Sequence, residues 1–119
     1  MAAYTTPCGR ILPLALANTV YSVWTLLQAH ATPPISEGLG PRCQWITLQF
    51  PYEVGAVGSA GFLFIGTEST MTNANYMAQI VPSQFYPIPS LGANWVRLDH
   101  LWVMADTATQ YVAVGFLQT

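Results

Sequence analysis

Short runs of β-branched and aromatic residues recur along this chain, separated by clusters of glycine, proline, asparagine and serine. This spacing is typical of a β-sandwich or barrel rather than of a helical fold. We predict eight strands: Arg10–Leu16, Val20–Leu27, Gln44–Phe50, Gly61–Gly66, Tyr76–Val81, Phe85–Ile88, Val96–Met104 and Gln110–Leu117. The second run also fits a helix, because Val20, Trp24 and Leu27 would share one helical face.

The length of 119 residues matches one domain. We therefore expect a single antiparallel, jelly-roll-like β-sandwich over residues 1–119. Two proline-containing, charge-poor segments, residues 1–9 and the Thr32–Pro41 loop, are predicted to be arms that reach across neighbouring molecules. The glycine-rich stretch Gly55–Gly61 is predicted to be a turn, since it has no lysine and no following helix to make a phosphate site.

Charge is scarce throughout the chain. Only 7% of the residues are charged and 52% are hydrophobic, and there is no lysine; an ordinary soluble domain carries about 25% charged residues. A chain so poor in charge is expected to cover much of its surface with partners. The alternative is a monomer kept soluble by Ser, Thr, Asn and Gln. With a net charge of −2 and no basic cluster, direct nucleic-acid binding is not expected.

Several predicted strands are apolar on both faces. In Gln44–Phe50 the alternation is clean, yet the polar face still carries Trp45. In Gly61–Gly66, Phe62 and Phe64 oppose Leu63 and Ile65. At the end of Val96–Met104, both faces are apolar as well, with Trp102 and Met104 opposite Leu101 and Val103. A sandwich in water needs only its inner faces to be apolar, so this pattern predicts outer faces covered by a loop, a neighbouring subunit or a partner.

Residues suited to chemistry are few. Asp99 and His100 are adjacent in a predicted strand, where their side chains would point to opposite faces, so we do not expect a catalytic pair. His30 stands alone before a proline-rich loop, and Ser59 lacks the Gly-x-Ser-x-Gly nucleophile motif. The carboxylates are too scattered to suggest a glycosidase pair or a calcium loop. We predict no enzyme activity, no metal site and no cofactor.

Two cysteines, Cys8 and Cys43, can form one disulfide at most and do not make a metal site. Two thiols are the favoured state. The uncharged stretch Ile11–Ser36 is long enough for a membrane span, but its prolines and polar residues, among them Pro13, Asn18 and the Pro33-Pro34 pair, argue against a transmembrane helix. No membrane association is predicted.

The four tryptophans and six tyrosines have two readings. They fill the core and the subunit contacts, where both residue types are enriched, or they form a platform on which sugars stack. We favour the first reading. The predicted interface residues are Trp45, Trp102, Tyr111, Pro33 and Pro34.

Three stretches of the second half resemble small β-sandwich virion proteins of tailed bacteriophages, of the capsid decoration (cement) or head, neck and fibre adaptor type. These are Phe62–Gly66 with the following Asn73–Tyr76, then Trp95–Ala105, and finally Tyr111–Val114. The likeness is one of strand order and turn chemistry over roughly Gln44–Gln118, without a diagnostic motif.

The resemblance implies a non-enzymatic structural protein of the virion, assembled in the host cytoplasm. It implies that the chain forms a homo-oligomer and binds the major capsid protein or another virion protein, most concretely as a decoration subunit. A carbohydrate-binding or receptor-binding sandwich of a tail, fibre or neck is the alternative.

Overall fold

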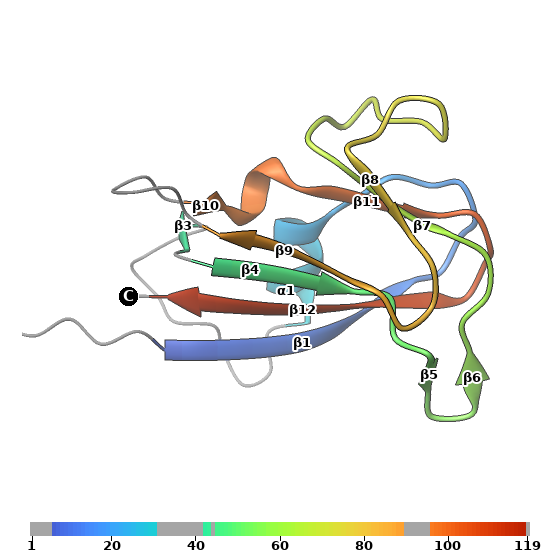
Figure 1. Cartoon of the computed structure of the whole chain (residues 1–119), viewed down its shortest axis with the longest axis horizontal. Helices are drawn as coiled ribbons and strands as arrows, with labels where there is room; N and C mark the ends of the chain where they lie inside the picture. Colours follow the sequence, from blue (N-terminus) through green and yellow to red (C-terminus); the bar gives the residue numbers. More distant parts are fainter. Residues whose placement is uncertain (1–5, 31–41, 44, 90–95, 119) are drawn as a thin grey trace, which may run out of the picture.

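The computed structural model describes residues 6–30, 42–43, 45–89 and 96–118. Two four-stranded antiparallel sheets dominate it (Figure 1), which confirms the predicted all-β, sandwich-like class. Sheet A has the strand order β1-β12-β4-β9, and sheet B has the order β2-β11-β7-β8. The strands of these two sheets are β1 (Thr6–Leu14), β2 (Tyr21–Ser22), β4 (Trp45–Gln49), β7 (Leu63–Gly66), β8 (Ala78–Ile80), β9 (Phe85–Pro89), β11 (Trp102–Ala105) and β12 (Gln110–Gln118).

The strand pairs are nested. The first strand β1 pairs with the last, β12, and β2 pairs with β11. Inside these lie the pairs β4 with β9 and β7 with β8. The two strands of each pair are therefore hydrogen-bonded neighbours in one sheet, even where they lie near opposite ends of the sequence, as β1 and β12 do.

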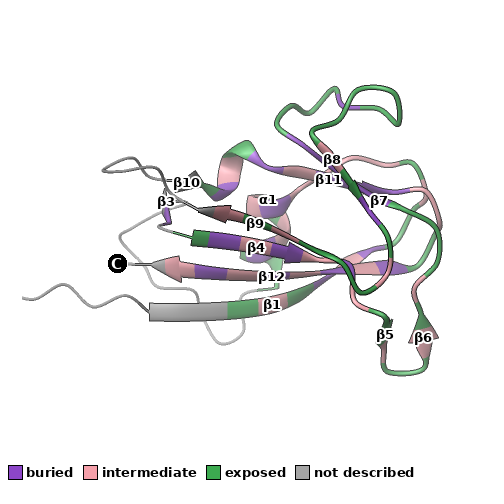
Figure 2. Cartoon of the chain, in the orientation of Figure 1, coloured by how far each residue is buried: buried purple, intermediate pink, exposed green. Residues whose placement is uncertain are grey.

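One hydrophobic core lies between the sheets. It takes alternate residues from each strand, because successive side chains on a strand point to opposite faces. Figure 2 shows this alternation as buried and partly exposed bands along β4 and β12. The fully buried members include Leu12 and Leu14 of β1, Ile46 and Leu48 of β4, Leu63 and Ile65 of β7, Val103 of β11, Val112 of β12, and Val23 and Leu27 of the helix α1 (Val23–Ala29).

The helix α1 corrects the predicted strand Val20–Leu27. Only Tyr21–Ser22 is strand, and Ser22 then caps the helix, its Oγ accepting a hydrogen bond from the Thr25 N–H at 3.3 Å. Val23 and Leu27 lie one helical turn apart and are both buried. The N-cap serine and the core contacts of one helical face therefore outweigh the strand preference of Val and Trp.

A second correction concerns the predicted strand Val96–Met104. It is interrupted by a 3-10 turn, η1 (Leu98–His100), which separates β10 (Val96–Arg97) from β11. Leu98 and Leu101 are both buried, so the chain must bend to place them in the core together. Strand β10 pairs with β3 (Arg42–Cys43), just before β4.

The ends and turns are also refined. The predicted arm over residues 1–9 is wrong for 6–9, because these residues begin β1 and pair with the end of β12. The predicted turn Gly55–Gly61 contains the turn of a small hairpin, β5 (Glu53–Val54) with β6 (Val57–Gly58), where Gly55 has a φ of 60°. The Thr32–Pro41 loop lies outside the described residues.

Two further predictions concern cysteine and membrane. Cys43 is fully buried in the core; the side chain of Cys8 is outside the described part, so the state of the pair stays a prediction. In the described part of the chain, no helix has the length and hydrophobicity needed to cross a membrane.

Candidate interaction surface

The outer face of sheet A is built from the strand positions that point away from the core. The register places Ile11, Ala113, Gln49 and Phe85 in one row across the four strands. The other described side chains of this face are Gly9, Pro13, Trp45, Thr47, Pro87, Tyr111, Gly115 and Leu117. None of these twelve positions holds an ionisable acid or base other than the tyrosine phenol. We call this surface the A face.

Large apolar side chains stand exposed on the A face. Phe85 is 63% exposed, Ile11 is 54% exposed and Trp45 is 39% exposed. Between Ile11 and Phe85 runs an open hollow whose lining includes Gly9, Ala113 and Gly115. Small residues at the centre and large ones beside them give this face a relief of ridge and hollow.

Polar groups on the A face are few and partly occupied. The Trp45 indole N–H donates to Thr47 Oγ1 at 2.6 Å, so the indole's one donor is used within the face. Among the residues that line the hollow only Arg10 is charged. Its Nη1 donates to the Gly9 carbonyl oxygen at 2.7 Å, at the border of the sheet. The face is therefore an apolar surface with a charge at its margin.

The outer face of sheet B, unlike the A face, is partly covered by a loop of the chain. Phe64 of β7 and Met104 of β11 are buried there beneath Met71, forming a second small core with Val20 and Trp102 packed against it. Met71 comes from residues 67–77, the connection between β7 and β8, which we call the cap. The Tyr76 ring also packs on Phe64, with ring centroids 5.0 Å apart. The predicted cover over a two-sided apolar strand is here a loop of the chain itself.

Backbone hydrogen bonds hold the cap in place. Thr72 and Asn75 exchange two N–H to carbonyl bonds of 3.1 Å, and the Met77 N–H donates to the Ile65 carbonyl at 2.7 Å. Gly66 lets the cap approach closely, since a Cβ there would lie 2.9 Å from the Met71 sulfur. Close packing on sheet B thus depends on a glycine at that position.

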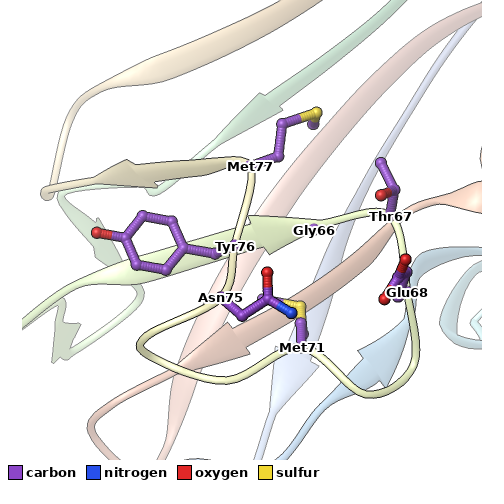
Figure 3. A pocket seen from close by; sticks show the side chains of 7 residues that line it. All are labelled: Gly66, Thr67, Glu68, Met71, Asn75, Tyr76 and Met77. Carbon is purple, nitrogen blue, oxygen red and sulfur yellow. The ribbon is translucent and has the colours of Figure 1, made fainter.

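A small hollow of about 140 Å³ lies between the cap and the end of β7. Figure 3 shows Met71 and Asn75 on one side of it and Thr67 and Glu68 on the other. It offers one carboxylate, and the described residues contain no group of three or more His, Cys, Asp or Glu suited to a metal ion. This hollow has no set of groups that would select a particular ligand.

The adjacent Asp99 and His100 lie in the η1 turn and not in a strand. The Arg97 guanidinium donates two hydrogen bonds to the Asp99 carboxylate, at 2.9 and 2.8 Å. These bonds lower the pKa of the Asp99 carboxyl and raise that of Arg97. His100 Nε2 is 4.0 Å from Asp99 Oδ1, beyond hydrogen-bond reach, and its side chain is 69% exposed. Asp99 thus serves an ion pair, not an orienting role for the imidazole.

The structure distributes the predicted interface residues over two surfaces. Trp45 and Tyr111 both belong to the A face, on β4 and β12, at opposite ends of it. Trp102 lies on the outer side of sheet B, half-buried beside the cap core. Pro33 and Pro34 lie outside the described residues. The five residues are therefore not brought together as one patch.

The most exposed large hydrophobic residues of the A face, Ile11 and Phe85, were not among the predicted interface residues. A signal for them exists in the sequence: Ile11 alternates with the core residues Leu12 and Leu14, and Phe85 alternates with Tyr86 and Ile88, which pack against the core. Recognising it requires the strand register, which pairs Ile11 with Ala113 and Gln49 with Phe85.

Comparison of the chain with protein-family models, with curated proteins and with solved structures finds no match.

Proposed function

We propose that this chain is a structural subunit of a protein assembly, most concretely a virion protein of the capsid-decoration type, which acts by burying its A face against a neighbouring subunit. The observation that carries the proposal is the A face: uncharged strand positions with Phe85 and Ile11 more than half exposed. Contiguous apolar surfaces that stay exposed on soluble proteins mark sites of interaction, of which contacts with another protein are one class.

The nested strand pairing supports the more specific jelly-roll interpretation. Two antiparallel sheets in which the first strand pairs with the last, and successive strands nest inside, are what a jelly roll of eight strands requires. Capsid and lectin domains both use this architecture. The support is an analogy of fold, and the A face has to supply the function.

The mechanism is burial and needs no catalytic group or cofactor. Covering an exposed aromatic or branched aliphatic side chain contributes about 1.5 to 3 kcal/mol at full burial. Phe85 and Ile11 would each gain most of that amount, since more than half of each is exposed in the isolated chain. Repeated over the copies of an assembly in the host cytoplasm, such contacts would hold neighbouring subunits of a shell together.

Density-gradient purification of particles from the source, followed by mass spectrometry, tests the proposal. We expect this chain to band with the major shell protein and to stay bound in high salt, because the contact is apolar and salt does not screen it. The Phe85→Asp variant should be lost from the particles. Tyr52→Asp is the matched control, since Tyr52 is 71% exposed and lies outside the A face. Recovery of the chain only in the low-mass soluble fraction would overturn the proposal.

Carbohydrate binding is the second candidate, and the observation that favours it is the composition of the hollow. Exposed Phe85 lies beside Gln49 and Thr47, an aromatic ring next to an amide and a hydroxyl. A glycan array would show micromolar binding that both Phe85→Ala and Trp45→Ala abolish. Retention of glycan binding in both variants would exclude the A face as the sugar site.

A further inference from the structure

The free edge of β9 is interrupted by proline. The Phe50 N–H donates to the Gln84 carbonyl at 3.0 Å, so even-numbered residues of β4 and β9 bond to each other. Backbone N–H groups alternate in direction along a strand. The N–H positions of the odd residues of β9 therefore point away from β4, toward the free edge of the sheet. Two of these three odd positions are Pro87 and Pro89, which have no N–H to offer.

The same alternation reaches the opposite edge. Odd residues of β4 bond to odd residues of β12, so the even residues of β12 bond to the even residues of β1. The backbone N–H positions of the odd residues of β1 then point toward the free edge of the sheet, and Pro7 and Pro13 are among these residues. Both edges of sheet A thus carry proline where an added strand would need a donor, a common way of blocking edge pairing.

Sheet B offers little edge for strand addition either. Its outermost strands are β2, with two residues, and β8, with three residues. The edges of both sheets are blocked or short, and the cap covers Phe64 and Met104 on the outer face of sheet B. The A face, where Ile11, Trp45 and Phe85 are exposed, is therefore an open apolar surface of the described part of the chain that suits association by face-to-face packing.

We propose that the neighbour seated on the A face is a second copy of this chain, packed face to face about a twofold axis. This inference rests on the proposed function and names the partner of the same surface. In a twofold interface each patch meets its own image, so a charged patch would repel itself. The A face carries no formal charge, and the guanidinium of Arg10 lies at its margin.

Shape and polarity also favour a second copy. The A face has few free directional groups with which to select a chemically different partner, because Trp45 already donates to Thr47. It does have relief: the ridges at Ile11 and Phe85 flank a strip of small residues at Ala113 and Gly115. A copy turned by 180° can place its ridges over the other copy's hollow.

The area of the A face fits a dimer of modest affinity. Strands of nine residues in β1 and β12 and five in β4 and β9 cover about 450 Å² in projection, at about 3.4 Å per residue and 4.8 Å per strand. Two such faces give about 900 Å² before side-chain relief is counted, close to the roughly 1,000 Å² at which specific interfaces begin. We therefore expect dissociation on dilution in the micromolar range.

Light scattering after size-exclusion chromatography of the full chain, over a micromolar to millimolar series, tests the dimer. We expect the mass to rise from 13.0 kDa toward twice that value. Phe85→Asp and Ile11→Asp should each weaken dimerisation by about a hundredfold, because each places like charges together in the interface. Tyr52→Asp should dimerise like the wild type. Both tested side chains are more than half exposed, so the variants should keep the wild-type unfolding midpoint, which is measured alongside.

A wild-type mass that stays at 13.0 kDa at the highest concentration would overturn the dimer. Variants that dimerise as well as the wild type would overturn the assignment of the dimer contact to the A face. The particle experiment separates this failure from failure of the proposed function. A monomeric chain that still enters particles through Phe85 would leave the structural role standing and make the neighbour a different protein. A dimer that never enters particles would leave the self-association standing and remove the virion role.

Discussion

Both sheets of this protein have apolar residues on their outer faces, but within the described residues only on sheet B does a loop of the chain bury them. Strands of both sheet A and sheet B carry apolar residues on the outer side as well as the inner side. On sheet B, the cap places Met71 over Phe64 and Met104 and buries all three. On the A face, Phe85 and Ile11 stay exposed. An apolar outer face therefore does not by itself mark an interface, because the chain can cover it with its own loop.

The difference follows from the connections between strands. The two strands β7 and β8 are neighbours in sheet B, yet eleven residues separate them, far more than a tight hairpin needs. That excess length folds back as the cap. In the described part of the chain, by contrast, no loop that follows or precedes a strand of sheet A covers Phe85 or Ile11, and both stay more than half exposed.

The largest effect is expected when a phenylalanine is removed from each of the two outer faces. Phe64→Ala should lower the free energy of unfolding by about 3 to 5 kcal/mol, the usual cost of emptying a buried phenylalanine site. Phe85→Ala, measured at low protein concentration, should change it by less than about 0.5 kcal/mol, because the ring is exposed. Urea denaturation measures both. Equal losses would show that the A face is covered within the isolated chain and would break the contrast.

A smaller test acts on the contact between the cap and sheet B. A Cβ added at Gly66 would lie 2.9 Å from Met71 Sδ and 3.2 Å from Met71 Cβ. Gly66→Ala should therefore cost about 1 to 3 kcal/mol by overpacking. Gly58→Ala is the matched control, since a Cβ there meets no atom within 4 Å. Thermal or urea unfolding gives both values.

The double variant sharpens the cause. If the Met71 side chain is what the new methyl group strikes, Gly66→Ala should cost less in a Met71→Ala background than in the wild type. An unchanged cost would show that the Met71 sulfur and methyl group do not cause the strain, and would place it at Met71 Cβ, which alanine keeps, or in the backbone of β7.

The sequence was sufficient for most of the strands and for their two-sided character, but not for the cover. The alternation in Gln44–Phe50 places Ile46, Leu48 and Phe50 on one face of the strand and Trp45 on the other, and the structure buries the first three and exposes Trp45. The alternation could not tell which outer face would be capped, since that depends on Met71, which has polar residues on both sides of it in the sequence. Its burial is decided by a tertiary contact across Gly66.

The local errors have the same origin. The helix α1 replaced a strand because its Val23 and Leu27 find space in the core beside sheet A. The η1 turn broke a predicted strand because both Leu98 and Leu101 are buried. The A face itself was foreseen through Trp45 and Tyr111 only, since Ile11 and Phe85 come together through the register of four strands that are distant in sequence.

The smallest effect is expected away from both outer faces, at the ion pair of Arg97 and Asp99. The hydrogen bonds from Arg97 lower the pKa of the folded Asp99 carboxyl below its ordinary value of 3.8. A lowered folded pKa means that the pair stabilises the fold above that ordinary value, and that this contribution is lost as the pH falls through the folded pKa.

The Asp99→Asn variant should therefore be less stable than the wild type at neutral pH, and this difference should become smaller at pH 3. Urea unfolding midpoints of both proteins at both pH values measure it. Glu53→Gln, an exposed carboxylate on β5, serves as the control for loss of a surface charge. The difference should be small, because the Asp99 and Arg97 side chains are partly exposed and solvent screens the pair. Self-association through the A face should not follow this titration, since the face lacks groups that ionise in this range. If dimerisation shifted with Asp99, the pair and not the apolar face would govern association, and the contrast between the two outer faces would lose its functional meaning.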